Sequence, residues 1–403
     1  MKYIEGGVCA AQGFTASGIH CGIRKNRDKR DLALIVSQKR AAAAAVYTQN
    51  LVKGAPLLVT KENLADGYAS AIICNSGNAN TCNANGVEIA REMCALTAAR
   101  LGVSAADIIV ASTGVIGQHL DISPIAAGMD ALAAGLSRNV VPAAEAILTT
   151  DTKMKSVAVE FDLGGKTSRL GGIAKGSGMI HPNMATMLVF LTTDAAISPA
   201  MLQKALSSDV KTSFNRVSVD GDTSTNDMCC ILANGMAGNA EIAAEGADYE
   251  AFCAALNAVT TALCRQIARD GEGATKLIEC SLTGAKTQAA ADSVSKAVIC
   301  SSLVKAAMFG ADANWGRVLC AIGYSGADVD VHKVDVAFRS AAGRVAVCKN
   351  GAGVPFSEAE AKKVLLEEEV TIEVDLNDGD CASLAWGCDL TYDYVKINGD
   401  YRT

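Results

Sequence analysis

Residues 175–187 of the chain read KGSGMIHPNMATM, a glycine-containing loop followed by a proline and then by Ala185 and Thr186. Glycine lets the backbone approach a ligand closely, and proline restricts the conformation of the chain around it. Thr186 stands at the start of a predicted strand that covers residues 187–191. On these residues alone, Thr186 is best interpreted as an ordinary β-branched strand residue. A small Ala-Thr junction in such a loop is nevertheless a place where a threonine hydroxyl could react.

On both sides of this stretch, predicted strands alternate with predicted helices. Ser-Pro pairs indicate helix starts at Ser123 and Ser198, where the serine hydroxyl is predicted to cap the helix and the proline to take its first position. A capping box indicates a third start at Ser357. Apolar residues at alternating four- and three-residue spacing predict a long amphipathic helix from near Tyr249 to Gly271. Apolar or β-branched runs predict strands at residues 108–112, 156–161, 187–191, 217–219, 334–338 and 370–374. The alternation indicates a mixed α/β fold.

Two glycine-dense segments, residues 171–178 and 270–273, are predicted to be loops. Neither fits a nucleotide-binding motif, because the first has its lysine before a glycine and the second has Lys276 where G-x-G-x-x-G requires glycine. The acidic segment 220–227 lacks the glycine and the glutamate of a calcium loop. A structural polar loop is therefore the better interpretation of that segment.

The length and composition limit the classes of protein to which the chain can belong. A length of 403 residues predicts two or three packed units, and a hydrophobic content of 50% predicts a folded chain. The net charge of −7 makes nucleic acid an improbable partner. The 15 cysteines are scattered without a C-x-x-C pair, so we expect buried, small apolar residues in a reducing compartment. We found no signal-peptide pattern and no apolar run of about 18 residues, and we therefore expect a cytoplasmic protein without membrane contact.

The chain has only four histidines and no G-x-S-x-G motif, so common histidine-dependent nucleophile arrangements are not indicated. Another route makes a threonine N-terminal by cleavage of the chain. The new α-amine, with an ordinary pKa of about 7.7–8.0, then serves as the general base for the threonine hydroxyl.

Further motifs follow one another along almost the whole chain. They are residues 75–80 (NSGNAN), 112–117 (STGVIG), 149–152 (TTDT), 175–187, 213–216 (SFNR), 220–227, 270–276 (DGEGATK), 314–317 (NWGR) and 400–403 (DYRT). In this order they resemble the motifs of the ornithine acetyltransferase family, also called glutamate N-acetyltransferase, of the acetyl-recycling arginine pathway.

The resemblance implies a precursor that cleaves itself between Ala185 and Thr186, giving an α chain of residues 1–185 and a β chain of residues 186–403. Thr186 would then be the nucleophile of a ping-pong transfer of acetyl from N2-acetylornithine to glutamate. The resemblance implies neither a metal nor an obligatory cofactor. It leaves open whether acetyl-CoA is a second acetyl donor.

Residue by residue, the resemblance implies an oxyanion hole at Thr113 and Gly114, where donors at a strand end could stabilise an alkoxide. Lys175 would contact the substrate α-carboxylate, while Glu272 would hold the ornithine ammonium or influence the amine of the nucleophile. The full set of implied substrate-binding positions is Thr149, Lys175, Thr186, Glu272, Asn398 and Thr403.

The fold implied by the resemblance is an N-terminal-nucleophile-like layered sandwich of sheets flanked by helices, with a smaller C-terminal α/β lobe. Residues 1–185 would begin the catalytic core, residues 186–281 would complete it, and residues 282–403 would form the lobe. The implied assembly is an α2β2 heterotetramer that acts on small molecules.

Two other functions remain open from the sequence. One is an N-terminal-threonine amidohydrolase or aminopeptidase of related fold, in which water replaces glutamate as the acceptor. The other is a non-catalytic protein that binds amino acids.

Overall fold

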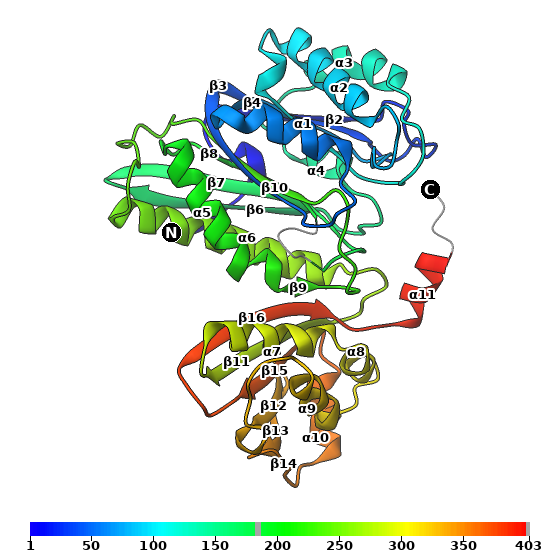
Figure 1. Cartoon of the computed structure of the whole chain (residues 1–403), viewed down its shortest axis with the longest axis vertical. Coiled ribbons are helices and arrows are strands. Elements are labelled where there is room, and N and C mark those ends of the chain that lie inside the picture. Colours follow the sequence, from blue (N-terminus) through cyan, green and yellow to red (C-terminus); the bar gives the residue numbers. More distant parts are fainter. Residues whose placement is uncertain (182–186, 400–403) are drawn as a thin grey trace.

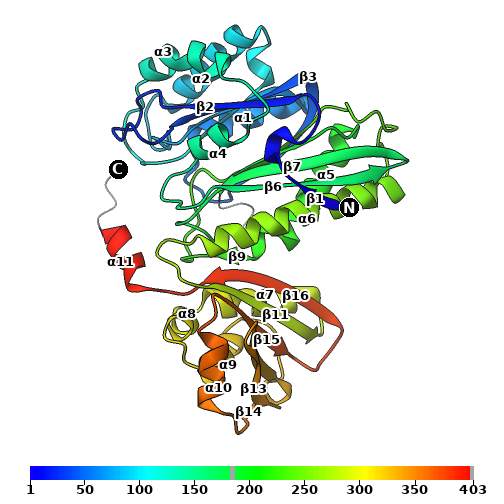
Figure 2. The same cartoon turned by 180° about the vertical axis from the view of Figure 1, so that it is seen from behind.

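The structure, a computed structural model, describes residues 1–181 and 187–399. The predicted residues Ala185, Thr186 and Thr403 lie outside this range. Within it the chain forms two units, each built on its own sheet (Figures 1 and 2).

The larger unit contains a sheet in the order β1-β6-β7-β8-β10-β3-β4-β5, with β2 paired to β3. Its strands are β1 (Lys2–Ile4), β2 (Phe14–Ile19), β3 (Leu32–Tyr47), β4 (Tyr68–Asn75), β5 (Ile108–Ser112), β6 (Lys155–Leu163), β7 (Lys166–Lys175), β8 (Leu188–Thr193) and β10 (Met228–Ala233). Its helices are α1 (Ala55–Asn63), α2 (Gly86–Leu101), α3 (Ser123–Ala134), α4 (Val141–Ala146), α5 (Pro199–Thr212) and α6 (Ala247–Arg269).

The smaller unit contains a sheet in the order β14-β13-β12-β15-β11-β16-β9. Its strands are β9 (Val217–Ser218), β11 (Leu277–Ala285), β12 (Asp335–Ser340), β13 (Gly343–Lys349), β14 (Ala352–Gly353), β15 (Glu369–Asp375) and β16 (Cys381–Cys388). Its helices are α7 (Gln288–Cys300), α8 (Ser302–Phe309), α9 (Trp315–Gly323) and α10 (Glu358–Leu365), followed by α11 (Tyr392–Gly399).

The long strand β3 explains how the larger unit is layered. Ala42 and Ala44 belong to a core that also contains residues of α5 and α6, whereas Ala41 and Ala43 belong to a core between the two halves of the sheet. A third core lies under α1–α3. Alternate side chains of a strand point to opposite faces, and alanines allow close packing on both. The larger unit therefore has four layers. The two halves of its sheet lie in the middle, and helices α1–α3 and α5–α6 form the two outer layers (Figure 1). The predicted fold class, a layered N-terminal-nucleophile-like sandwich with a smaller C-terminal lobe, is confirmed.

Helix α6 joins the two units. It packs on β6 and β7 of the larger sheet, and its core cluster also contains Trp386 of β16. In the described chain only α6 is long and apolar enough to cross a membrane, and 50% of that window is buried inside the protein.

Several local predictions are confirmed. Strand β5 has the predicted bounds, and the Ser198 hydroxyl caps α5 by accepting a hydrogen bond from the N–H of Met201 at 3.4 Å. The hydroxyl of Ser357 caps α10 by accepting from the N–H of Glu360 at 3.3 Å. Ser123, in contrast, is the first residue of α3 and not its cap, because the Asp121 carboxylate accepts its N–H at 2.9 Å.

The predicted loop at residues 171–178 is wrong for residues 171–175, which belong to strand β7. The glycines there serve packing. A Cβ on Gly171 would lie 2.0 Å from the Gly7 carbonyl oxygen, and one on Gly172 would lie 2.4 Å from a methyl carbon of Leu191. These contacts require glycine in a strand that has backbone and side chains directly above it.

All 15 cysteines lie in the described residues and are free. Nine are buried, as predicted, and four are half-buried. Cys82 and Cys320 are exposed, so the prediction of buried cysteines fails at these two positions.

Candidate active site

A cavity of about 300 Å³, called the central cavity below, is lined by residues from both units. Its wall includes every predicted site residue that the structure describes: Thr113, Gly114, Thr149, Lys175, Glu272 and Asn398. Positions far apart in the sequence therefore meet around one space of the size of a small ligand.

Thr113 and Gly114 follow directly after β5. The N–H of Thr113 donates to the Asn75 carbonyl oxygen at 2.9 Å, so its hydroxyl is the group available to the cavity. Gly114 has φ 126°, and a Cβ there would lie 2.8 Å from the carbonyl carbon of Gly77. Only glycine fits this position. Among the described residues the N–H of Gly114 has no acceptor, so it can donate to a ligand oxygen.

Asn226 fixes the turn that carries these donors. Its amide nitrogen donates to the carbonyl oxygens of Ala79 (2.6 Å) and Ser112 (3.0 Å), and its amide oxygen accepts from the hydroxyls of Thr81 and Thr225 (2.5 and 2.6 Å). The side chain is 5% exposed. Because all these groups are paired and buried, the strand end has little freedom to move.

Lys175 ends β7 and is buried, with 8% of its surface exposed. Behind it lies a buried ion triad of Asp151, Lys155 and Asp270. The ammonium of Lys155 contacts a carboxylate oxygen of Asp151 at 2.7 Å and one of Asp270 at 2.6 Å. All three side chains are at most 4% exposed.

The ion triad connects the segments that carry the site. Asp151 accepts the N–H of Thr149 at 3.0 Å and the N–H of Gly176 at 2.7 Å. Asp270 accepts the N–H of Thr152 at 3.1 Å. Burial raises the pKa of Asp151, but the nearby charges of Lys155 and Lys175 outweigh burial and hold it well below its usual range.

Glu272 lies opposite, on the turn that follows α6. Its N–H donates to the Ser177 carbonyl oxygen at 2.9 Å, and its carboxylate accepts from the Asn398 amide at 2.7 Å. A Cβ on Gly178 would lie 2.4 Å from the Glu272 carboxyl carbon, so glycine makes room for this carboxylate.

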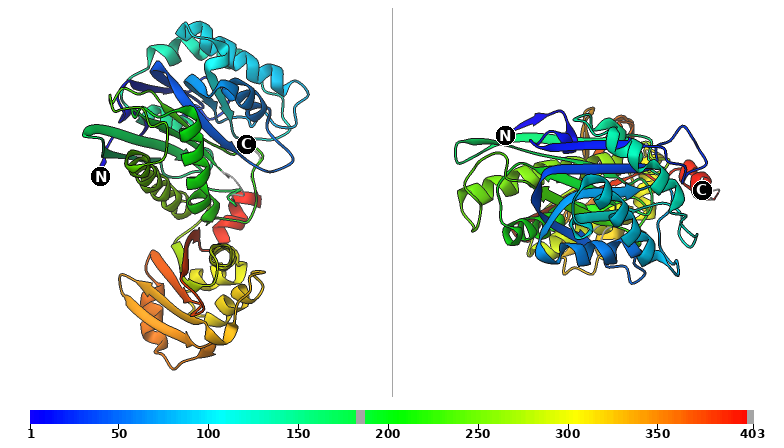
Figure 3. Two further views of the ribbon diagram at one scale, coloured as in Figure 1. Left: turned by 60° about the vertical axis from the view of Figure 1, so that its left-hand side comes forward. Right: turned by 90° about the horizontal axis from the view of Figure 1, so that it is seen from above.

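Helix α11 brings Asn398 to the cavity. The helix extends from the smaller unit toward the larger one (Figures 1 and 3). The Thr391 hydroxyl just before it donates to the Gly273 carbonyl oxygen at 2.7 Å. Because Gly273 belongs to the same turn as Glu272, this contact fixes the two site residues relative to each other.

Two described residues flank the predicted nucleophile. Met187 lines a small space of about 20 Å³ together with Thr113 and Lys175. On the other flank, burial and the charge of Lys296 lower the pKa of His181 to about 4, so its imidazole is neutral at pH 7. The Nδ1 atom of His181 lies 3.1 Å from the Ser218 hydroxyl.

Comparison with known proteins decides the family. The sequence model of the ArgJ family matches residues 15–403. The chain belongs to the ArgJ family. The resemblance inferred from the motifs is thereby confirmed.

Relatives in this family match the whole chain. The arginine biosynthesis bifunctional protein ArgJ of Symbiobacterium thermophilum is 52% identical, with 100% of both chains covered. The protein of the same name from Caldanaerobacter subterraneus is 49% identical, also with 100% of both covered. The crystal structure of ArgJ from Bacillus halodurans matches with a TM-score of 0.50 and 48% identity, covering 53% of this chain and 98% of that one.

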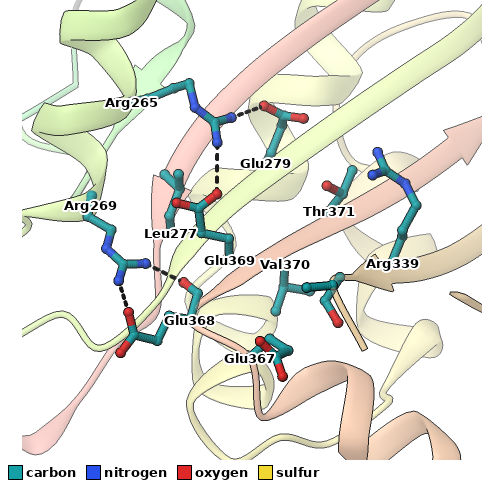
Figure 4. Close-up of a pocket in the computed structure, with 12 residues that line it drawn as sticks. Arg265, Arg269, Leu277, Glu279, Arg339, Glu367, Glu368, Glu369, Val370 and Thr371 are labelled. Atoms are coloured by element: carbon teal, nitrogen blue, oxygen red, sulfur yellow. Dashed lines mark hydrogen bonds and ion pairs between the residues drawn. The ribbon is translucent and has the colours of Figure 1, made fainter. Parts of the chain in front are cut away.

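A second, larger cavity is not part of the candidate active site. It measures about 450 Å³ and lies between α6 and the smaller unit, where none of the predicted residues line it (Figure 4). Its arginines are already paired: Arg339 with Glu373 inside the smaller unit and, between the two units, Arg265 with Glu279 and Glu369 and Arg269 with Glu368. These charges hold the two units together.

Sequence reasoning did not single out Asn226, Asp151, Lys155 or Asp270 as individual site residues. Three of them, Asp151, Asn226 and Asp270, lie inside matched family motifs. Membership of these motifs was the sequence signal that could have pointed to them. Lys155 carries no such signal, since it belongs to no quoted motif. The structure supports the interpretation of residues 220–227 as a structural polar loop, and it also places Ser224 on the cavity wall.

Proposed function

We propose that the chain is an acyltransferase of arginine biosynthesis that moves the acetyl group of N2-acetylornithine to glutamate. The observation that carries the proposal is the central cavity, in which an oxyanion-type donor pair, a buried lysine and a buried carboxylate face one space. A small zwitterionic amino acid requires these groups, because its carboxylate pairs with a cation and its ammonium with an anion.

We assign Thr186 as the nucleophile. Its α-amine takes the proton of the hydroxyl while Oγ bonds to the acetyl carbonyl carbon, and the resulting alkoxide accepts from the Thr113 hydroxyl and the Gly114 N–H. The C–N bond then breaks, and the proton passes to the departing N2 of ornithine. Glutamate repeats the steps in reverse: its amine attacks the acetyl ester, and Thr186 recovers its proton. The position of Met187 beside Thr113 and Lys175 supports this assignment.

In this scheme Lys175 contacts the substrate α-carboxylate and Glu272 the side-chain ammonium of ornithine. Thr149, Asn398 and Thr403 complete the binding positions. The hydrogen bond from Asn398 to Glu272 supports the role of Asn398, since it orients the carboxylate without neutralising it.

We also propose that Thr186 becomes N-terminal by self-cleavage. Its Oγ attacks the Ala185 carbonyl, and the acyl group moves from N to O, which frees the α-amine. Water then hydrolyses the ester, which separates the two chains and restores the Thr186 hydroxyl. Residues 186–403 would form a β chain of 218 of the 403 residues, with 186–281 completing the core and 282–403 forming the lobe. The solved Bacillus halodurans chain, which covers 53% of this chain, supports that length.

Because the two relatives described above are named bifunctional, we propose acetyl-CoA as a second acetyl donor. We further propose an α2β2 assembly in the cytoplasm. An assay with acetyl-CoA and glutamate tests the first point, and the mass of the native particle tests the second.

The decisive experiment incubates the protein with N-acetylornithine, with and without glutamate. We expect ornithine and N-acetylglutamate in equal amounts, in steady turnover, only when glutamate is present. Acetate release that ignores glutamate would favour the amidohydrolase. An uncut chain that binds amino acids without turnover would favour a binding protein.

A further inference from the structure

A third cavity, called the basic cavity below, opens beside the central cavity. It measures about 450 Å³, and Gly114, Thr149 and Thr150 line both spaces. Three cationic side chains line it, Arg24, Lys25 and Lys29, and no acidic side chain of the described residues does. The two cavities thus share a wall but differ in charge.

The cationic residues lie on a segment that is anchored to the core. The Asp31 carboxylate, which is fully buried, accepts the N–H groups of Cys21 at 2.6 Å and Arg24 at 2.9 Å. The Arg24 guanidinium donates to the Ser76 carbonyl oxygen at 3.0 Å and also to the Leu148 carbonyl oxygen. This segment is therefore fixed against the wall that carries Thr149.

Lys29 contacts the shared wall directly. Its ammonium lies 3.4 Å from the carbonyl oxygen of Thr149, one of the predicted substrate-binding residues. Lys25 and Lys29 are exposed, and so each keeps donors for a ligand.

The two substrates of the proposed reaction differ most in charge at the end of the side chain. Ornithine ends in an ammonium, which suits Glu272, whereas glutamate ends in a carboxylate, which Glu272 repels. A site that accepts both on the same nucleophile needs a separate place for the negative end.

We propose that the basic cavity is the subsite for the side-chain carboxylate of glutamate, with Lys29 and Lys25 as its partners. This inference rests on the proposed transferase function. The α-amino-acid part of glutamate stays in the central cavity with Lys175, and its side chain turns past Gly114 and Thr149 toward Lys29, away from Glu272.

The test compares Lys25→Gln, Lys29→Gln and the double variant with Lys39→Gln, an exposed lysine that lines neither cavity. Each single change is expected to raise KM for glutamate about fivefold relative to KM for N-acetylornithine, the size of one partly exposed ion pair. Lys39→Gln should leave both values as they are. The preference for glutamate over glutamine as acceptor should fall by the same factor, which a loss of structure would not produce.

Salt provides a second readout. Raising the ionic strength should increase KM for glutamate in the wild type and less so in the double variant, because screening acts on exposed charges. An unchanged glutamate-to-glutamine preference in the double variant, in a protein that does transfer acetyl, would overturn the inference and leave the transferase intact. A rise confined to KM for a phosphate-bearing donor such as acetyl-CoA would also overturn the inference and leave the transferase intact. A wild type that never acetylates glutamate would instead refute the proposed function itself.

Discussion

Replacing Lys155 by methionine tests the buried ion triad behind the site. The change keeps an unbranched side chain of nearly the same length but removes the only cation within 2.7 Å of Asp151 and Asp270 in the described chain. Two carboxylates, both nearly inaccessible to water, would then face each other across an apolar side chain. Removing one member of a buried ion pair typically costs about 3–5 kcal/mol. At about 2–4 °C per kcal/mol for a unit of this size, Tm should fall by about 6–20 °C.

The sign of the pH dependence follows from the pKa of Asp151. In the wild type this pKa is lowered, so the carboxylate stabilises the fold above its ordinary pKa of about 3.9 and loses that effect only as the pH falls further. Without Lys155, burial dominates and the pKa rises. The fold is then destabilised at neutral pH and recovers as mild acid protonates the carboxylate. The stability deficit of the variant should therefore be largest near neutrality and smaller toward about pH 5.

Thermal unfolding across this pH range measures the effect. Lys153→Met is the matched control, since Lys153 is exposed and offers Asp270 only its backbone N–H. If Lys155→Met does not fold, Lys155→Met with Asp270→Asn should restore part of the loss, because it removes one of the two facing charges. A loss of less than about 1 kcal/mol at neutral pH, or a deficit that does not change with pH, would refute the reasoning.

Three further predictions concern the reaction. Thr186→Ala should remain a single 403-residue chain without transferase activity, which intact-mass analysis and the acetyl-transfer assay would check; normal two-chain maturation would remove Thr186 from the mechanism. Gly114→Ala should reduce kcat by about 10²–10³-fold in a chain with a native circular dichroism spectrum, because its Cβ would lie 2.8 Å from Gly77 and displace an oxyanion donor. Glu272→Gln should raise KM for N-acetylornithine by about tenfold, the loss of one charge-assisted hydrogen bond, with a smaller effect on KM for glutamate; equal effects on both would contradict the assignment of Glu272 to the ornithine ammonium.

Local signals predicted parts of the fold well, and long-range packing explains the failures. The cap of α5 at Ser198 depends on a hydroxyl three residues from its partner, so the sequence contains it. Strand β7 was missed because Gly171 and Gly172 are poor strand formers, and their reason for being there is the close approach of Gly7 and Leu191.

The same contrast between local signals and long-range packing applies to the candidate site. Residues of the cavity wall such as Thr113 and Glu272 could be singled out from motifs, since a motif fixes residue types next to one another in the chain. The partner of Asp151 could not, because Asp151 and Asp270 are joined through Lys155 across 119 positions and only the folded sheet brings them together. Asn226 likewise reaches Ala79 and Ser112, which lie far away in the sequence.

The charges around the central cavity fit the proposed reaction, in which one nucleophile serves two substrates of opposite side-chain charge. The ion triad carries two carboxylates and one ammonium, and its excess negative charge faces the ammonium of Lys175. This arrangement suits the proposed role of Lys175, which is to contact the α-carboxylate, a group that both amino acids possess. In the same proposal, Glu272 is the negative group that would distinguish the ornithine side chain. The positive groups of Lys25 and Lys29 lie beyond Thr149, outside this balance, where they can attract a side-chain carboxylate without weakening the contact between Glu272 and ornithine. In the proposed reaction, separation of the two charges into adjoining cavities would allow both half-reactions to use the same Thr186.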